Sequence, residues 1–149
     1  MLKTDINTNL QELYEKDYHL WLETAIKLLK EKALNKIDLD HLIEALESLS
    51  RRDKAKVVSL LKQIIIHRLF LQLWTEELKN NQNHWEAEIL AFRDQLNRLL
   101  TNNLRNYLDS ELEIVYQNSV KIASKKMHYN INQVSQQCYY TIEQLLIDE

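Results

Sequence analysis

The sequence predicts an all-helical bundle, and two observations support this prediction. The 149 residues include no glycine and no proline, so the two residues that most often interrupt helices are absent. Apolar side chains recur at steps of three and four along most of the chain, which is the spacing of one face of an α-helix. We therefore expect a single all-α domain over residues 1–149, with about five main helices and short helical segments at its termini.

The first helices are predicted in the N-terminal third. A weak helical turn around residues 10–14 precedes a long helix over about 17–32, which buries Trp21 and its apolar neighbours. Asp38 is placed to cap a short second helix, because an aspartate can accept a hydrogen bond from the amides of a first helical turn. The face of this helix that we expect to be buried consists of Leu39, Leu42, Ile43, Leu46 and Leu49.

The most apolar stretch, IIIHRLFLQLW at residues 64–74, is predicted to lie in the middle of the bundle. Ser50 and Asp53 have the spacing of a capping box, which would open a third helix that ends near Leu78. Apolar residues cover most of the circumference of this helix, as expected for a helix packed on several sides or at an interface. His67 occupies a regular position in its apolar seam.

Asparagines are expected to end helices, since asparagine tolerates the left-handed backbone conformation that glycine would otherwise supply. The run NNQN at residues 80–83 is predicted to separate the third helix from a fourth, which Asn83 and Glu86 would open. Residues 101–103, with the sequence TNN, would then separate the fourth helix from the fifth.

The C-terminal part predicts a fifth helix over about 104–127 and a short terminal helix over 142–147. Thr141 and Gln144 have the spacing of a capping box for the terminal helix. The three tryptophans fall on apolar helix faces, and at least one indole N–H is expected to need a hydrogen-bond acceptor.

Six segments between about Leu13 and Asp148 resemble segments of a known family and follow the same order. They are YEKDYHLWLE, IDLDHLIEALESL, IIIHRLFLQLW, NHWEAEILAFRDQL, LEIVYQNSVKIA and QCYYTIEQLLID. The chain resembles domain-of-unknown-function family 29, found largely in cyanobacteria, and the resemblance implies a small all-helical bacterial protein with no assigned activity. Ser50 stands where the family pattern often has glycine, and Asn102 and the tail lack expected prolines. Positions that match family marks are Asp17, Trp21, Asp38, Glu44, Glu47, His67, Trp85, Arg93 and Tyr116.

His67 is the first candidate for a functional residue. We interpret it as a packed core histidine that needs a hydrogen-bond partner, because an unpaired polar group there would cost about 1–3 kcal/mol. Glu47 flanks the apolar face of the preceding helix and is the partner we predict. The alternative is a metal site of His67, Glu47 and Glu44, since helical bundles build such sites from facing histidines and carboxylates. One histidine with two glutamates matches no established metal pattern, so no cofactor is expected.

Arg51, Arg52, Lys54 and Lys56 form a basic cluster that offers a second candidate, a surface for nucleic acid. Asp53 interrupts the cluster, no aromatic residue within it could stack on bases, and the whole chain has a net charge of −3. A solvated helix surface is the interpretation we favour.

Composition narrows the classes of function. The single cysteine, Cys138, cannot form an internal disulfide, which fits a reducing compartment such as the cytoplasm. No apolar run is long enough to span a bilayer, and no arrangement of nucleophile and base marks a catalytic site. We expect a non-enzymatic interaction module that binds another protein or itself. The alternatives are a ligand- or metal-binding bundle centred on His67 and Glu47, and a nucleic-acid-associated protein.

Overall fold

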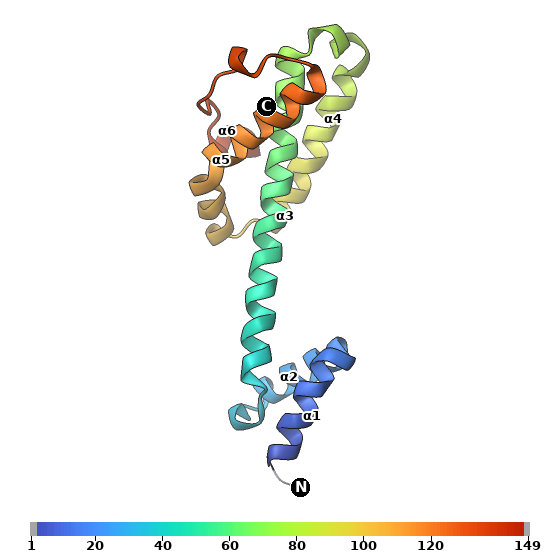
Figure 1. Cartoon of the computed structure of the whole chain (residues 1–149), viewed down its shortest axis with the longest axis vertical. Helices are drawn as coiled ribbons and strands as arrows, with labels where there is room; N and C mark the ends of the chain where they lie inside the picture. Colours follow the sequence, from blue (N-terminus) through green and yellow to red (C-terminus); the bar gives the residue numbers. More distant parts are fainter. Residues whose placement is uncertain (1–2, 148–149) are drawn as a thin grey trace. The chain divides into compact units, whose positions relative to one another are not determined.

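The computed structural model describes residues 3–147, and all of the regular structure in that range is helical (Figure 1). This confirms the predicted all-α class. The helices are α1 (Lys3–Lys16), α2 (Tyr18–Lys30), α3 (Leu39–Leu73), α4 (Thr75–Leu99), α5 (Asn102–Met127) and α6 (Ile142–Leu146), with short 3₁₀ turns η1 (Leu34–Lys36) and η2 (Ile131–Gln133). The chain divides into two compact units, Met1–Arg51 and Arg52–Glu149, so the expectation of one domain over residues 1–149 stays a prediction.

The N-terminal unit contains α1, α2, η1 and the first turns of α3. Its small core consists of Leu10, Trp21, Ala25 and Ala45. Helix α2 begins, as predicted, after Asp17, whose carboxylate accepts a hydrogen bond from the amide of Leu20 at 3.1 Å. Helix α1 is much longer than the weak turn predicted around residues 10–14. Its polar sequence gives little apolar periodicity, and packing against α2 supplies stability that propensity alone does not.

Helix α3 corrects the prediction of two helices separated at Ser50. The helix is continuous from Leu39 to Leu73, and Ser50 and Asp53 lie inside it. A serine and an acidic residue three positions apart form a capping box only where the preceding backbone is non-helical, and here it is helical. Every residue from 49 to 56 is exposed, so no tertiary burial marks this stretch in the sequence pattern.

The break between α3 and α4 also differs from the prediction. It falls at Trp74, which precedes α4, and the run NNQN at residues 80–83 is helical. Asn81 shows how an asparagine is accommodated there, since its side-chain amide donates to the carbonyl of Glu77 at 3.0 Å, one turn earlier. Asn83 and Glu86 therefore do not open a helix.

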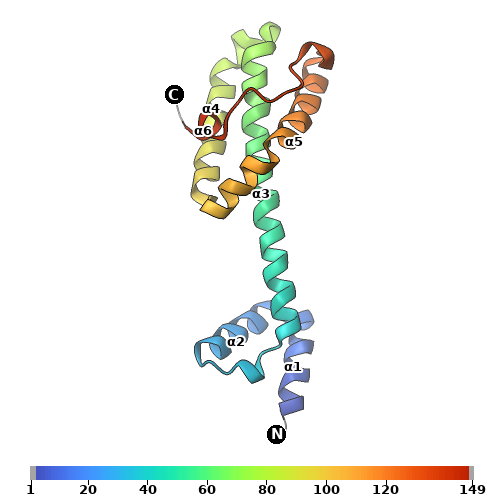
Figure 2. The same cartoon turned by 90° about the vertical axis from the view of Figure 1, so that its left-hand side faces the viewer.

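The C-terminal unit is built on α3, which lies between α4 and α5 (Figure 2). Among the described residues, its core contains twenty-three that are apolar and buried, and those of α3 run from Val57 to Phe70. The segment after α5 crosses α3 and places α6 beside α4. The hydroxyl of Tyr116 donates to the carbonyl of Ser135 at 2.8 Å and helps to hold this segment. Helix α6 opens with the predicted capping box of Thr141 and Gln144.

Two helices in the described range end with a residue in the left-handed conformation. We predicted asparagine at such positions, but the two residues are a lysine and a histidine. Lys32 follows α2 with φ of 58°, and His128 follows α5 with φ of 55°. The amide of Tyr129 donates to the carbonyl of Ser124 at 2.9 Å, and that of Ala33 donates to Leu28 at 2.9 Å. These six-to-one bonds are the Schellman pattern, which glycine usually serves.

Candidate functional site

His67 is half-buried on α3, and its hydrogen bond is local. Its Nδ1 lies 2.7 Å from the carbonyl oxygen of Gln63 on the preceding turn. A carbonyl can only accept, so Nδ1 donates and Nε2 carries no proton in the neutral ring. Phe70 and Phe92 pack against the ring at centroid distances of 5.5 and 5.6 Å. Burial lowers the pKa of His67, although the Gln63 bond and the nearby carboxylate of Glu88 oppose this effect.

The predicted pair of Glu47 and His67 stays a prediction. Glu47 belongs to the N-terminal unit and His67 to the C-terminal unit. The hydrogen bond that the structure gives His67 is the one to the carbonyl of Gln63. Glu44 and Glu47 are exposed. Within the described range, no group of three histidine, cysteine, aspartate or glutamate side chains could hold a metal ion.

The basic cluster lies within the exposed middle part of α3. Arg51, Arg52, Lys54 and Lys56 are all exposed and are spread around the helix. They lie in the interior of α3 and not at a helix start, so the helix dipole does not act on them. The ammonium of Lys54 lies 5.0 Å from the centroid of the Tyr107 ring, a cation–π contact with α5.

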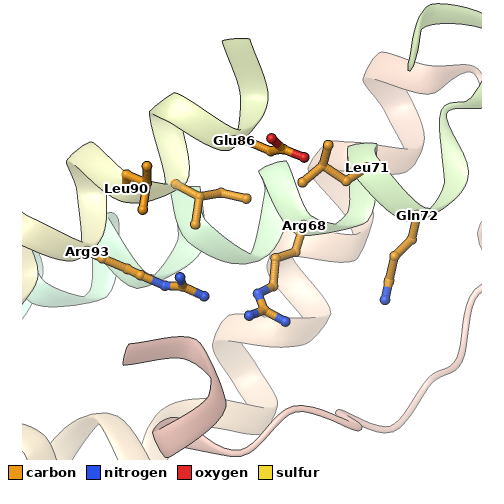
Figure 3. Close-up of a pocket in the computed structure, with 7 residues that line it drawn as sticks. Arg68, Leu71, Gln72, Glu86, Leu90 and Arg93 are labelled. Carbon is orange, nitrogen blue, oxygen red and sulfur yellow. The ribbon is translucent and has the colours of Figure 1, made fainter. Parts of the chain in front are cut away.

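A groove of about 480 Å³ lies on the C-terminal unit, and sequence reasoning did not identify it. Figure 3 shows that Arg68 and Gln72 from α3 and Arg93 from α4 extend to the same side of the helix pair. The side-chain carbonyl of Gln72 accepts from the hydroxyls of Tyr139 and Tyr140 at 2.7 and 2.8 Å. The residues that line the groove are Arg68, Leu71, Gln72, Glu86, Ile89, Leu90 and Arg93.

The buried arginine of this groove caps the end of α6. Arg93 is 6% exposed, and its Nε donates to the carbonyl of Leu145 at 2.8 Å. Its Nη2 donates to the carbonyl of Gln144 at 3.4 Å, and Asn97 donates to Leu146 at 3.2 Å. The last carbonyls of a helix have no partner within it, and they carry partial negative charge that a cation stabilises. These contacts attach the C-terminal segment to α4.

A cluster of rings around a buried carboxylate organises the N-terminal unit. Asp38 is buried at the start of α3 and accepts from Trp21 Nε1 at 3.3 Å and from His41 Nδ1 at 2.6 Å. This confirms that one indole N–H needs an acceptor. The His41 ring stacks on Tyr14 with centroids 4.1 Å apart. Burial, followed by the charge of Glu44, raises the pKa of Tyr14.

The N-terminal unit also carries two groups of exposed apolar residues. The face predicted to be buried in the short second helix is largely exposed, since Leu39 is 61% and Leu46 is 57% accessible. We name as the α3 stripe the row Leu39, Ile43 and Leu46 with the parallel acidic row Asp40, Glu44 and Glu47.

The second surface lies on α2 and η1. Its most exposed residue is Leu34, with 70% of its surface accessible, on the η1 turn. We name as the lysine patch the exposed residues Ile26, Leu29 and Leu34 with Lys27, Lys30, Lys32 and Lys36. Both surfaces escaped sequence reasoning, because apolar spacing identifies a helix face but does not say whether a neighbour covers it.

Within residues 3–147, no helix has both the length and the apolar composition needed to cross a membrane.

Comparison with known proteins identifies the family of this chain. Neither a curated protein nor a solved structure matches the chain. The family model described as "Domain of unknown function DUF29" matches residues 13–149, nearly the whole sequence. The chain therefore belongs to the DUF29 family.

Proposed function

We propose that this protein is a non-enzymatic interaction module, and that its N-terminal unit provides the binding surface. The observation that carries the proposal is the distribution of exposed apolar side chains. Of fifteen large exposed apolar residues in the described part of the chain, nine lie between Tyr18 and Leu49. Contiguous apolar surface on a folded protein is characteristic of sites where another molecule binds.

The packing of the N-terminal unit supports this proposal. Leu39, Ile43 and Leu46 follow one another at steps of four and three on a regular helix, so they form one continuous row. Ala45, on another side of the same helix, is buried in the unit's own core. The row therefore faces away from the core, and burying one such side chain fully contributes about 1.5–3 kcal/mol to an interface.

Site-specific photocrosslinking in the native host tests this function. A photoreactive phenylalanine analogue at Leu46 is expected to crosslink a protein chain, whereas the same analogue at Ile114 of α5 serves as the matched control. Ile114 is also exposed and apolar, but it lies outside the N-terminal unit. Absence of a specific product at Leu46, or equal products at both positions, would contradict the proposal.

A further inference from the structure

We propose, on the basis of this proposed function, that the partner of the α3 stripe is the lysine patch of a second copy of this chain. The two surfaces have matching apolar content and opposite charge. Each presents three large exposed apolar side chains, Leu39, Ile43 and Leu46 on one and Ile26, Leu29 and Leu34 on the other. Two amphipathic surfaces of this kind bury their apolar rows by packing against each other.

The charges on the two surfaces are complementary. Between residues 39 and 49 there are three carboxylates and no lysine or arginine. Between residues 26 and 36 there are four lysines and one glutamate, and all of these side chains are exposed. Like surfaces would repel each other, so the charges favour contact of the α3 stripe with the lysine patch over contact of either surface with its own kind.

A second copy satisfies both surfaces at once. Each chain carries one α3 stripe and one lysine patch, so a dimer forms the same contact twice, with the stripe of each copy on the patch of the other. An unrelated partner that matched only one surface would leave the other exposed. Once one contact has formed, the second forms within the same complex, which raises its effective concentration.

Charge reversal on one surface at a time tests the pairing. We expect the wild-type chain to sediment as a dimer at about 100 μM. Glu44→Lys with Glu47→Lys, or Lys27→Glu with Lys30→Glu, should raise the dissociation constant at least tenfold. In each variant both contacts of a homodimer place like charges together. The altered residues are exposed, so circular dichroism should show unchanged helix content.

Mixing the two reversed chains gives the decisive measurement. In a mixed dimer both contacts again join opposite charges, so sedimentation equilibrium should show a one-to-one dimer that neither variant forms alone. Ile114→Lys should leave wild-type association unchanged. A wild-type chain that stays monomeric, or a mixture that stays monomeric, would overturn the proposal. If Leu46 then crosslinks a different protein, the interaction function survives and only self-recognition fails; if Leu46 gives no product, both fail.

Discussion

At the scale of single residues, two side chains show how polar groups next to the apolar core of the C-terminal unit find hydrogen-bond partners. His67 uses a carbonyl of its own helix, and Arg93 uses carbonyls at the end of α6. The partner of His67 lies four positions away in the sequence, whereas that of Arg93 lies fifty-two positions away. A residue's need for a partner can be predicted from its sequence context, but the partner's identity depends on tertiary structure.

His67 should make stability depend on pH. Burial lowers its pKa below the ordinary value of 6.5, so in that interval the unfolded chain binds a proton that the folded chain does not. The free energy of unfolding should therefore fall as pH decreases from about 6.5 toward the folded pKa. Urea titrations at several pH values should show a shallower fall for His67→Leu. His19→Leu, the same change at an exposed histidine, should keep the wild-type slope.

Arg93 should not be replaceable by lysine. A guanidinium donates in two directions from one plane, and an ammonium cannot reproduce that geometry. Arg93→Lys is expected to lower the free energy of unfolding by about 1.5–3 kcal/mol, the usual contribution of hydrogen bonds to charged groups. The control is Arg98→Lys on the same helix, whose exposed pair with Asp94 contributes at most about 0.5 kcal/mol. Equal losses measured by urea denaturation would contradict the capping role.

At the scale of helices, α3 combines two environments in one element. From residue 49 to 56 all of its side chains are exposed, whereas from Val57 onward it runs through the core of the C-terminal unit. Main-chain hydrogen bonds are the same in both parts, but only the second gains stability from burial.

Amide hydrogen exchange should separate these two parts. Amides of residues 50–56 are expected to exchange faster than those of residues 60–66 by at least tenfold, because no side chain of the exposed stretch belongs to the apolar core. Nuclear magnetic resonance or mass spectrometry can measure this within one molecule. Ala55→Gly should accelerate exchange further in the exposed stretch only, since glycine costs about 1 kcal/mol in a helix. Uniform protection along α3 would contradict this account.

Helix content could be predicted more reliably than helix boundaries. The starts of α5 and α6 follow local capping by Thr101 and Thr141, and such local signals are visible in the sequence. Ser50 and Asn83 carry the same local signals inside continuous helices. The candidate site was predicted least well, because the α3 stripe has the periodicity of a buried face and lacks a covering element.

At the scale of the molecule, the two units differ in how much apolar surface they bury. Among the described side chains, the core cluster of the N-terminal unit has four buried apolar residues, and that of the C-terminal unit has twenty-three. Since burial supplies most of the free energy of folding, the two units should differ strongly in intrinsic stability.

Urea unfolding should therefore show two transitions. Tryptophan fluorescence from Trp21 alone, in a variant with Trp74 and Trp85 replaced by phenylalanine, should change at lower urea than the helix signal of the C-terminal unit. Leu61→Ala should shift only the later transition, by about 2–5 kcal/mol. Coincident transitions would show that the chain unfolds as one cooperative domain.

Lys32 and His128, in the left-handed conformation at helix ends, lower the free energy of unfolding, and substitution can raise it. A side chain at positive φ strains the backbone by roughly 1–2 kcal/mol, and replacement by glycine removes this strain. Glycine also increases the entropy of the unfolded chain, so only part of that free energy is gained. His128→Gly and Lys32→Gly should each raise the free energy of unfolding by about 0.5–1 kcal/mol. Lys27→Gly, at an exposed position in the interior of α2, should lower it by about 1 kcal/mol. Two glycine substitutions should thus stabilise a protein whose sequence contains no glycine.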